Sequence, residues 1–181
     1  MRNYLTQYRA FLFFLGKFFL AYLFLTFVYQ LFLAQFDTSK FEVDNFTKLV
    51  AEQSVFVMRF FDHSAHSLTN FSDVSVKLFY NSHYVSRVVE GCNALSVIIL
   101  FVSFVIAFSG KWKPTLLYIL GGSLLIHFCN VLRIGFLSIL MFNYPKQKQL
   151  LHGVLFPLLI YGVVFILWII WVNKFSNYAK K

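Results

Sequence analysis

The sequence is poor in charge, and acidic residues are the scarcest charged type. Only 13% of the 181 residues are charged, and 7 aspartates and glutamates stand against 16 lysines and arginines. In contrast, 59% are hydrophobic and 25 are phenylalanine, and the mean hydropathy is +0.69. A soluble core of this size could not hide so many aromatic side chains from water, whereas lipid solvates them. The composition excludes an ordinary soluble domain and predicts a membrane protein.

Cysteine is also scarce, with only Cys92 and Cys129 in the chain. Two cysteines cannot form a disulfide framework, and no C-x-x-C or Cys/His ligand spacing accompanies them. The pattern therefore predicts no metal and no cofactor. Internal repeats and low-complexity linkers are missing as well, which indicates a single domain over residues 1–181.

Four apolar runs are candidates to cross a bilayer as helices, which takes about 20 apolar residues. They are roughly Phe11 to Ala34, Ala94 to Phe108, Thr115 to Phe142 and Gly153 to Val172, and the second is short but extendable. The first run is too long for a cleaved signal peptide and has no A-x-A-like exit, so it predicts a retained anchor. The predicted fold class is an all-α integral membrane protein with about four transmembrane helices.

The basic residues lie at the ends of these runs, which is the pattern of membrane topology and excludes nucleic acid as a partner. One side of a four-span arrangement collects Arg2, Arg9, Lys111, Lys113, Lys174, Lys180 and Lys181. The positive-inside rule makes this side cytoplasmic, although Lys146 and Lys148 in the second outer loop count against it. The segment 35–91, which holds every acidic residue, is then extracytoplasmic. We expect a multi-pass protein of the inner, or cytoplasmic, membrane of the cell.

The outer segment has patterns of its own. Apolar residues recur at helical spacing from Phe46 to Phe61, which predicts an amphipathic helix lying on the membrane. Further along, Val74, Val76 and Leu78 alternate with polar residues, Asn81-Ser82 supplies a turn, and β-forming residues follow to Val89. This pattern predicts a β-hairpin before the second span, whose second arm delivers Cys92 to the membrane.

Three reactive side chains fall near the outer membrane boundary in this topology. Cys92 stands where a polar segment gives way to an uncharged run, and His152 stands at the start of the fourth run. Arg133 lies roughly 27 Å along the third span, counted from Thr115 at about 1.5 Å per residue. The flanking charges alone indicate this topology. The common depth of the three residues is therefore an independent observation.

Together, a thiol, a guanidinium and an imidazole can carry out acyl transfer. A thiolate is a strong nucleophile and a neighbouring cation stabilises it. Histidine can deprotonate the thiol and later protonate a leaving amine. Arginine can hold a carbonyl or a developing oxyanion through two parallel hydrogen bonds. We therefore predict Cys92, Arg133 and His152 as the catalytic residues.

Each of these residues also has an ordinary interpretation. An interfacial cysteine is usually inert, and His152 alone could be an ordinary interfacial histidine. Arg133 could form a structural ion pair or reach the outer headgroups, although burying it costs at least about 2.5–3.5 kcal/mol and such residues are usually functional. It is their joint occurrence at one depth that favours chemistry.

Two asparagines are predicted to orient or bind the substrate. Asn130 lies one turn before Arg133 on the same helix face, where it could also serve as packing between helices. Asn93 directly follows Cys92. Cys129 has no boundary position and is predicted to be inert, and His127 is interpreted as a buried, hydrogen-bonded histidine.

These residues resemble the exosortase/archaeosortase family of membrane cysteine transpeptidases. The resemblance rests on Cys92 in Glu90-Gly91-Cys92-Asn93-Ala94, on Arg133 in Asn130-Val131-Leu132-Arg133-Ile134, and on His152 in His152-Gly153. The short length and the Gly-Cys-Asn-Ala sequence are most similar to the small type F subgroup of exosortases. The motifs cover the chain from about Tyr84 to Tyr161.

The resemblance implies cleavage of a C-terminal sorting signal through a thioacyl intermediate. The partner would be an exported protein that ends in a short motif, a transmembrane segment and a basic tail, met in membrane lipid at the extracytoplasmic face. Two alternatives stay open. A non-enzymatic membrane assembly factor for surface-protein export would not need Cys92, and a small transporter subunit would need Arg133 to be accessible from both sides.

Overall fold

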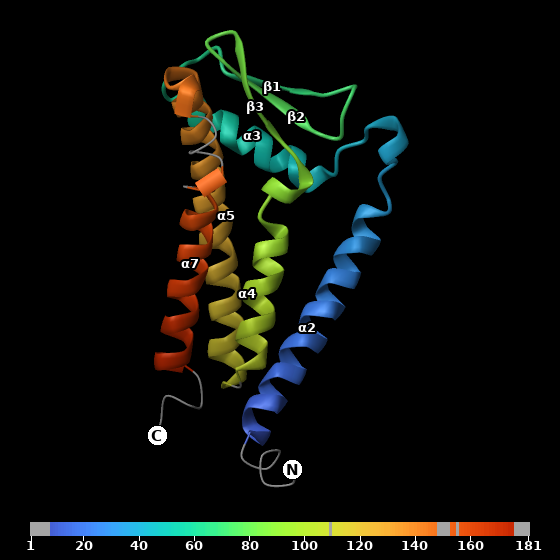
Figure 1. Ribbon diagram of the computed structural model, residues 1–181, viewed down its shortest axis with the longest axis vertical. Helices are drawn as coiled ribbons and strands as arrows, with labels where there is room; N and C mark the ends of the chain where they lie inside the picture. Colours follow the sequence, from blue (N-terminus) through green and yellow to red (C-terminus); the bar gives the residue numbers. More distant parts are fainter. Residues whose placement is uncertain (1–7, 109, 148–152, 155, 176–181) are drawn as a thin grey trace.

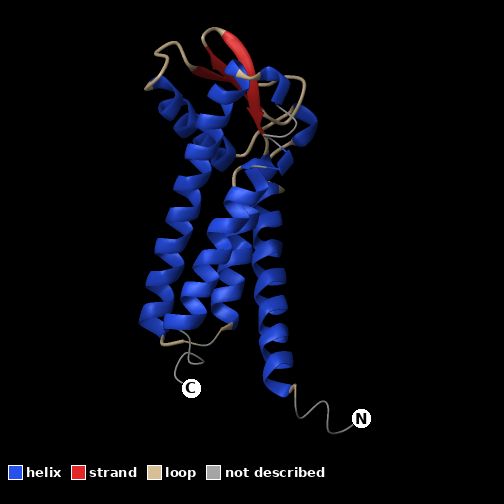
Figure 2. Cartoon of the chain, turned by 60° about the vertical axis from the view of Figure 1, so that its left-hand side comes forward, coloured by secondary structure: helices blue, strands red, loops and turns tan. Residues whose placement is uncertain are grey.

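The computed structural model describes residues 8–108, 110–147, 153–154 and 156–175, and a bundle of four helices forms most of it. These helices are α2 (Arg9–Leu33), α4 (Leu95–Ala107), α5 (Trp112–Asn143) and α7 (Phe156–Ile170), which continues into the π-helical turn η5 (Trp171–Phe175). They run alongside one another, and the start of α2 and the end of α7 lie at the same end of the bundle (Figure 1). The opposite end carries a helix, α3, and a small sheet, which we call the cap (Figure 2).

The apolar runs predicted as spans are helices in the structure. Three of them are long and apolar enough to cross a membrane: Phe11–Leu33, Trp112–Asn143 and Pro157–Phe175. The second is the 13-residue helix α4, which at about 1.5 Å per residue is only ~20 Å long. Large apolar side chains along α2 are exposed, among them Leu20 and Phe24. The chain is an all-helical membrane protein in its spanning part, with a shorter second pass than the sequence suggested.

Helix α3 (Asn45–Arg59) crosses the end of the bundle beneath the sheet (Figure 1). It begins after Asp44, whose carboxylate accepts a hydrogen bond from the Thr47 N–H at 2.8 Å. Val50 and Met58 on its inner face are fully buried in a core shared with the sheet and α5. The predicted amphipathic helix is therefore confirmed. Its inner face packs against protein, while Phe60, just beyond its last residue, is exposed.

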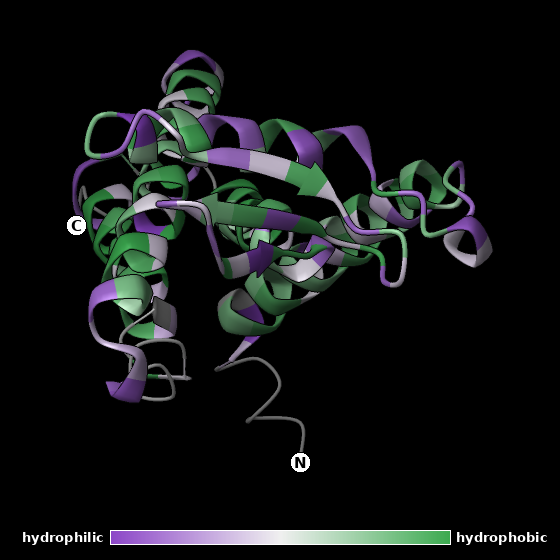
Figure 3. Ribbon diagram, turned by 90° about the horizontal axis from the view of Figure 1, so that it is seen from above, coloured by the Kyte–Doolittle hydropathy of each residue, from purple (hydrophilic) through white to green (hydrophobic). Residues whose placement is uncertain are grey.

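Three antiparallel strands in the order β1-β2-β3 cover α3, and Figure 3 shows polar and apolar residues mixed along them. They are β1 (His66–Thr69), β2 (Val76–Tyr80) and β3 (His83–Val88). β2 and β3 form the predicted hairpin. Asn81 and Ser82 both have positive φ, at 50° and 61°, which makes the connection a type I′ turn. Strand β1 was not predicted, because it is a four-residue strand in a polar stretch without alternation.

The hairpin turn is tied to the end of α3 by Asp62. Its carboxylate accepts hydrogen bonds from the Asn81 N–H at 2.5 Å and from the N–H and hydroxyl of Ser64. These donors hold the pKa of Asp62 below its usual value, with the Asn81 N–H as the largest cause. An ionised carboxylate therefore fixes the outer tip of the cap.

Close packing between α4 and α5 depends on Gly122. A Cβ atom at this position would come within 2.3 Å of the Phe101 ring, which is fully buried in α4. Its neighbour Gly121 has no atom within 4 Å of an equivalent Cβ. Of these two adjacent glycines, only Gly122 is needed for close packing.

Gly122→Ala should destabilise the protein, because the fully buried Phe101 ring cannot move aside without disturbing its neighbours. We expect a loss of about 1–3 kcal/mol, the usual cost of overpacking a core, measured as the thermal unfolding midpoint in detergent micelles. Gly121→Ala is the matched control and should be unchanged or slightly more stable, since alanine favours a helix over glycine by about 1 kcal/mol. Equal midpoints for the two variants would contradict the packing described here.

Candidate functional site

The cysteine of interest lies on a short turn between the sheet and the bundle. A 3₁₀ turn, Glu90–Cys92, joins β3 to α4, with hydrogen bonds from the Cys92 N–H to the Val89 carbonyl and from the Asn93 N–H to the Glu90 carbonyl. Ala94 then adopts a left-handed conformation with φ of 66°, which a residue with a Cβ seldom adopts. We call residues 90–94 the Cys92 turn. Cys92 itself is half-buried.

Asn93 fastens this turn to two other helices. Its side-chain amide donates to the Thr47 hydroxyl of α3 at 3.0 Å and to the Tyr29 hydroxyl of α2 at 3.3 Å. Its side-chain oxygen accepts from the Leu95 N–H at 2.9 Å, at the start of α4. Asn93 is 1% exposed, so these protein groups satisfy it and water does not.

Two more hydrogen bonds complete the fastening. Tyr29 donates its hydroxyl hydrogen to the Glu90 carboxylate at 2.7 Å. Asn130 of α5 donates to the backbone carbonyl of Cys92 at 2.9 Å, which places the cysteine level with the middle of α5 and one turn from Arg133. Neither asparagine lines the pocket described below. Both asparagines hold the Cys92 turn in place through these hydrogen bonds.

A pocket of about 450 Å³ lies between β3, the Cys92 turn, α5 and α7, within the size range of small-ligand sites. Its walls come from every one of these elements: Tyr84, Ser86, Arg87, Val88, Gly91, Cys92, Val97, Arg133, Ile134, Leu137, Met141, Pro157, Ile160 and Tyr161. The charged side chains among them are both arginines, and Arg87 forms an ion pair with Asp73.

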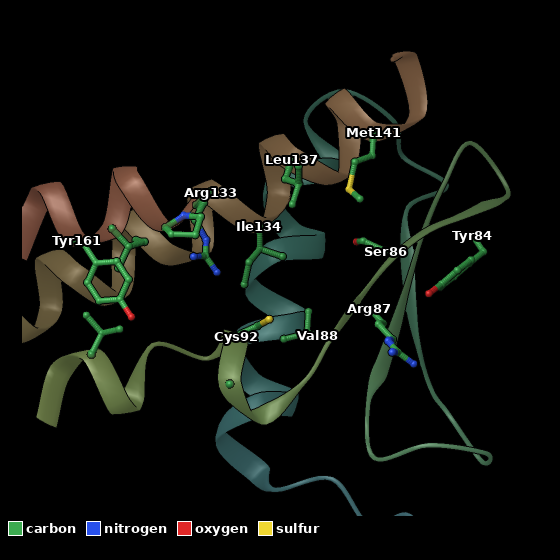
Figure 4. A pocket seen from close by; sticks show the side chains of 14 residues that line it. Tyr84, Ser86, Arg87, Val88, Cys92, Arg133, Ile134, Leu137, Met141 and Tyr161 are labelled. Atoms are coloured by element: carbon green, nitrogen blue, oxygen red, sulfur yellow. The ribbon is translucent and has the colours of Figure 1, made fainter. Parts of the chain in front are cut away.

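Cys92 and Arg133 face each other inside this pocket, although 41 residues (133 − 92) separate them in the sequence. The Arg133 guanidinium and the Tyr161 hydroxyl are directed toward the part of the pocket that holds Cys92 (Figure 4). A thiol, a guanidinium and a phenol are thus gathered in one partly apolar space, where they could act on the same substrate atom.

Tyr161 lines the pocket, but the sequence did not indicate it as a site residue. It lies inside the fourth apolar run among other aromatic residues and belongs to no motif, so only its placement beside Arg133 distinguishes it. His152 lies outside the described residues. Cys129 does not line the pocket, and His127 points elsewhere, with its Nε2 hydrogen-bonded to Gln53 of α3 at 2.7 Å. Within the described ranges no group of three or more His, Cys, Asp or Glu could hold a metal ion.

Comparison with known proteins adds the family. The sequence model of the transmembrane exosortase family matches residues 5–174, which is nearly the whole chain. The protein belongs to the transmembrane exosortase family. Comparisons with curated proteins and with solved structures find no significant match.

Asn93→Ala should lower the thermal stability of the protein, because it removes three hydrogen bonds and leaves the buried Thr47 hydroxyl short of a partner. We expect a loss of about 1–3 kcal/mol, the cost of leaving a buried polar group unsatisfied, measured by thermal unfolding in micelles. The control is Asn143→Ala, whose amide bonds only the exposed Ile139 carbonyl and should have little effect. Comparable losses would mean that the Cys92 turn is not held by Asn93.

Proposed function

We propose that this exosortase is a membrane-embedded cysteine peptidase or transpeptidase that cleaves C-terminal sorting signals of exported proteins. The observation that carries the proposal is the shared pocket of Cys92 and Arg133, at the junction of the spanning helices and the cap. A nucleophile and an oxyanion-binding group are the two components that acyl transfer needs first. An assembly factor or a transporter subunit has no use for a thiol at this place.

The reaction would begin with the Cys92 thiolate attacking a peptide carbonyl carbon, after His152 has taken the thiol proton. The carbon–sulfur bond forms, and the carbonyl oxygen gains negative charge beside the Arg133 guanidinium. Collapse of this intermediate breaks the carbon–nitrogen bond, and His152 gives its proton to the departing amine.

A thioacyl enzyme would remain, with the exported protein joined to Cys92. Water or an amine of an acceptor then attacks the same carbonyl carbon, the carbon–sulfur bond breaks, and the thiol is restored. The Tyr161 hydroxyl, which lines the same pocket, would donate a further hydrogen bond to the oxyanion. Arg133 and Tyr161 together would stabilise charge that develops only during the reaction, which is the condition for lowering its barrier.

The basic ends of the helices support the location of the site. Arg9, Lys111 and Lys174 lie at the helix ends far from the cap, and the positive-inside rule assigns that end to the cytoplasm. The cap and the pocket would then face the extracytoplasmic side of the cell membrane. An exported protein held by a transmembrane segment with a basic tail would present its motif at this level.

Cys92→Ala should abolish processing, because it removes the nucleophile that forms the thioacyl intermediate, and no other cysteine lines the pocket. The measurement is a comparison of exported proteins between cells carrying the wild type and cells carrying the variant, in which substrates accumulate with an intact C-terminal segment. Cys129→Ala is the control and should process normally at the same protein abundance.

A membrane-impermeant maleimide provides a second measurement on intact cells. It should label Cys92 and leave Cys129 unlabelled, since only Cys92 lines the pocket near the cap. Labelling of Cys129 alone, or unchanged processing by Cys92→Ala, would refute the proposed function.

Arg133→Lys should insert normally yet lose about a hundredfold or more in processing rate. Lysine keeps the charge but lacks the planar fork that gives two parallel hydrogen bonds, and losing one oxyanion donor costs about 2.7–4 kcal/mol. The rate is followed as the ratio of processed to full-length substrate after a pulse of labelling. Arg9→Lys, at the far end of the bundle, serves as the control, and near-normal processing by Arg133→Lys would leave the arginine with a structural role only.

A further inference from the structure

The outer edge of strand β3 borders the pocket. The strand order gives β3 a single neighbour, β2, so its other edge has no strand beside it in the part of the chain that the structure describes. Ser86 and Val88 face inward, Ser86 hydrogen-bonding Ser138 of α5 at 2.7 Å and Val88 being buried. Tyr84 and Arg87 lie on the exposed side. All four line the pocket, and residues from both faces of one strand can do so only if the pocket runs along its edge.

The backbone groups on this edge follow from the register of the hairpin. Tyr80 and His83 flank the two-residue turn and form a hydrogen-bonded pair. The register shifts between Leu78 and Phe79, because β3 carries one extra residue there, Val85, and β2 carries none. Hydrogen-bonded and non-bonded pairs therefore still alternate along β2, and Lys77 and its partner Arg87 are a non-bonded pair. The N–H and C=O of Arg87 therefore point away from β2, toward the pocket.

We propose that the segment around the cleavage site of the substrate binds as an added strand along the outer edge of β3, parallel to it. This inference rests on the proposed function and specifies how the substrate is held. Main-chain hydrogen bonds to the edge would provide affinity, and the pocket walls would select side chains. The added strand ends at Cys92, because β3 leads directly into the Cys92 turn (Figure 4).

The edge of β3 lies near the membrane, and this position makes pairing with a substrate strand favourable. A peptide leaving a transmembrane helix carries N–H and C=O groups that cost several kcal/mol each when they meet neither water nor another partner. The edge of β3 supplies these partners at the level where the substrate chain must be extended to expose a peptide bond.

The direction follows from the membrane anchor of the substrate. β3 runs from the tip of the cap toward the bundle, and the chain then enters α4 (Figure 1). A substrate with its exported part outside and its transmembrane segment C-terminal to the motif passes the site in the same direction. The two strands are therefore parallel.

Proline at position 87 tests the edge. Arg87→Pro removes an N–H that makes no bond to β2, so the hairpin should remain intact while the added strand loses a partner. Relative to Arg87→Ala, which keeps the N–H, processing should fall by about five- to tenfold, the effect of one hydrogen bond. The probe is the exported protein that accumulates uncleaved in Cys92→Ala cells.

The matched control is a proline on the opposite edge of the same sheet. Ser67 of β1 pairs with Leu78, and the same alternation turns its N–H outward, so Ser67→Pro should process like the wild type. Equal processing by Arg87→Pro and Arg87→Ala, with normal thermal unfolding of both, would overturn the proposal. If no exported protein accumulates in Cys92→Ala cells, it is the proposed function that fails.

Cross-linking tests the added strand even if the Arg87→Pro variant does not fold. Cys92→Ala with Cys129→Ala removes both native thiols and leaves the substrate uncleaved. Single cysteines are then placed at Tyr84 or Arg87, with Leu68→Cys on β1 as the control, and paired with a cysteine scan of the substrate. We expect cross-links at every second substrate position, with Arg87→Cys reaching positions nearer the membrane anchor than Tyr84→Cys. A spacing of three to four residues, the reverse order, preferential reaction with Leu68→Cys, or no cross-link would overturn it.

Discussion

The hydrogen bonds around the Cys92 turn are the constraint on which the rest of the pocket depends. The single side chain of Asn93 links the turn to three elements: α2, α3 and the first residue of α4. Asn130 links the turn to α5. Ala94 stays in a left-handed conformation because these bonds hold the residues on both sides of it. The turn ends the sheet, begins a spanning helix and carries the thiol, so one polar network sets the relative position of all three.

Arg133 shows how a chain with few charges accommodates one inside its third span. A guanidinium in hydrocarbon is costly, and here it faces a pocket whose walls are partly polar, instead of lipid. The cap makes this possible. β3 and the Cys92 turn border the pocket beside the half of α5 nearer the cap. The helix reaches this level because it is 32 residues long, more than a bilayer alone requires.

Much of this architecture could be predicted from the sequence, because hydropathy and alternation are local signals. They gave the bundle helices, the helix α3 and the hairpin with its Asn81-Ser82 turn. The common depth of Cys92 and Arg133 was predicted from charges at the helix ends, and in the structure both residues line one pocket. What could not be predicted depends on contacts between distant segments. The roles of Asn93 and Tyr161 arise only once four elements have packed together, and so does the exposure of one sheet edge to the pocket. Strand β1 is a different case, because it is too short to show a pattern.

The short α4 has a further consequence for the lipid around the protein. Its ~20 Å of helix falls short of the roughly 30 Å hydrocarbon core, which α2 can cross, as can α7 together with η5. Such hydrophobic mismatch costs fractions of a kcal/mol per ångström, and the bilayer meets it by thinning locally. Thinning beside α4 would bring water closer to the Cys92 thiol than to the rest of the bundle. Bilayer thickness therefore affects the site, because a thicker membrane raises the free-energy cost of the local thinning that exposes the thiol.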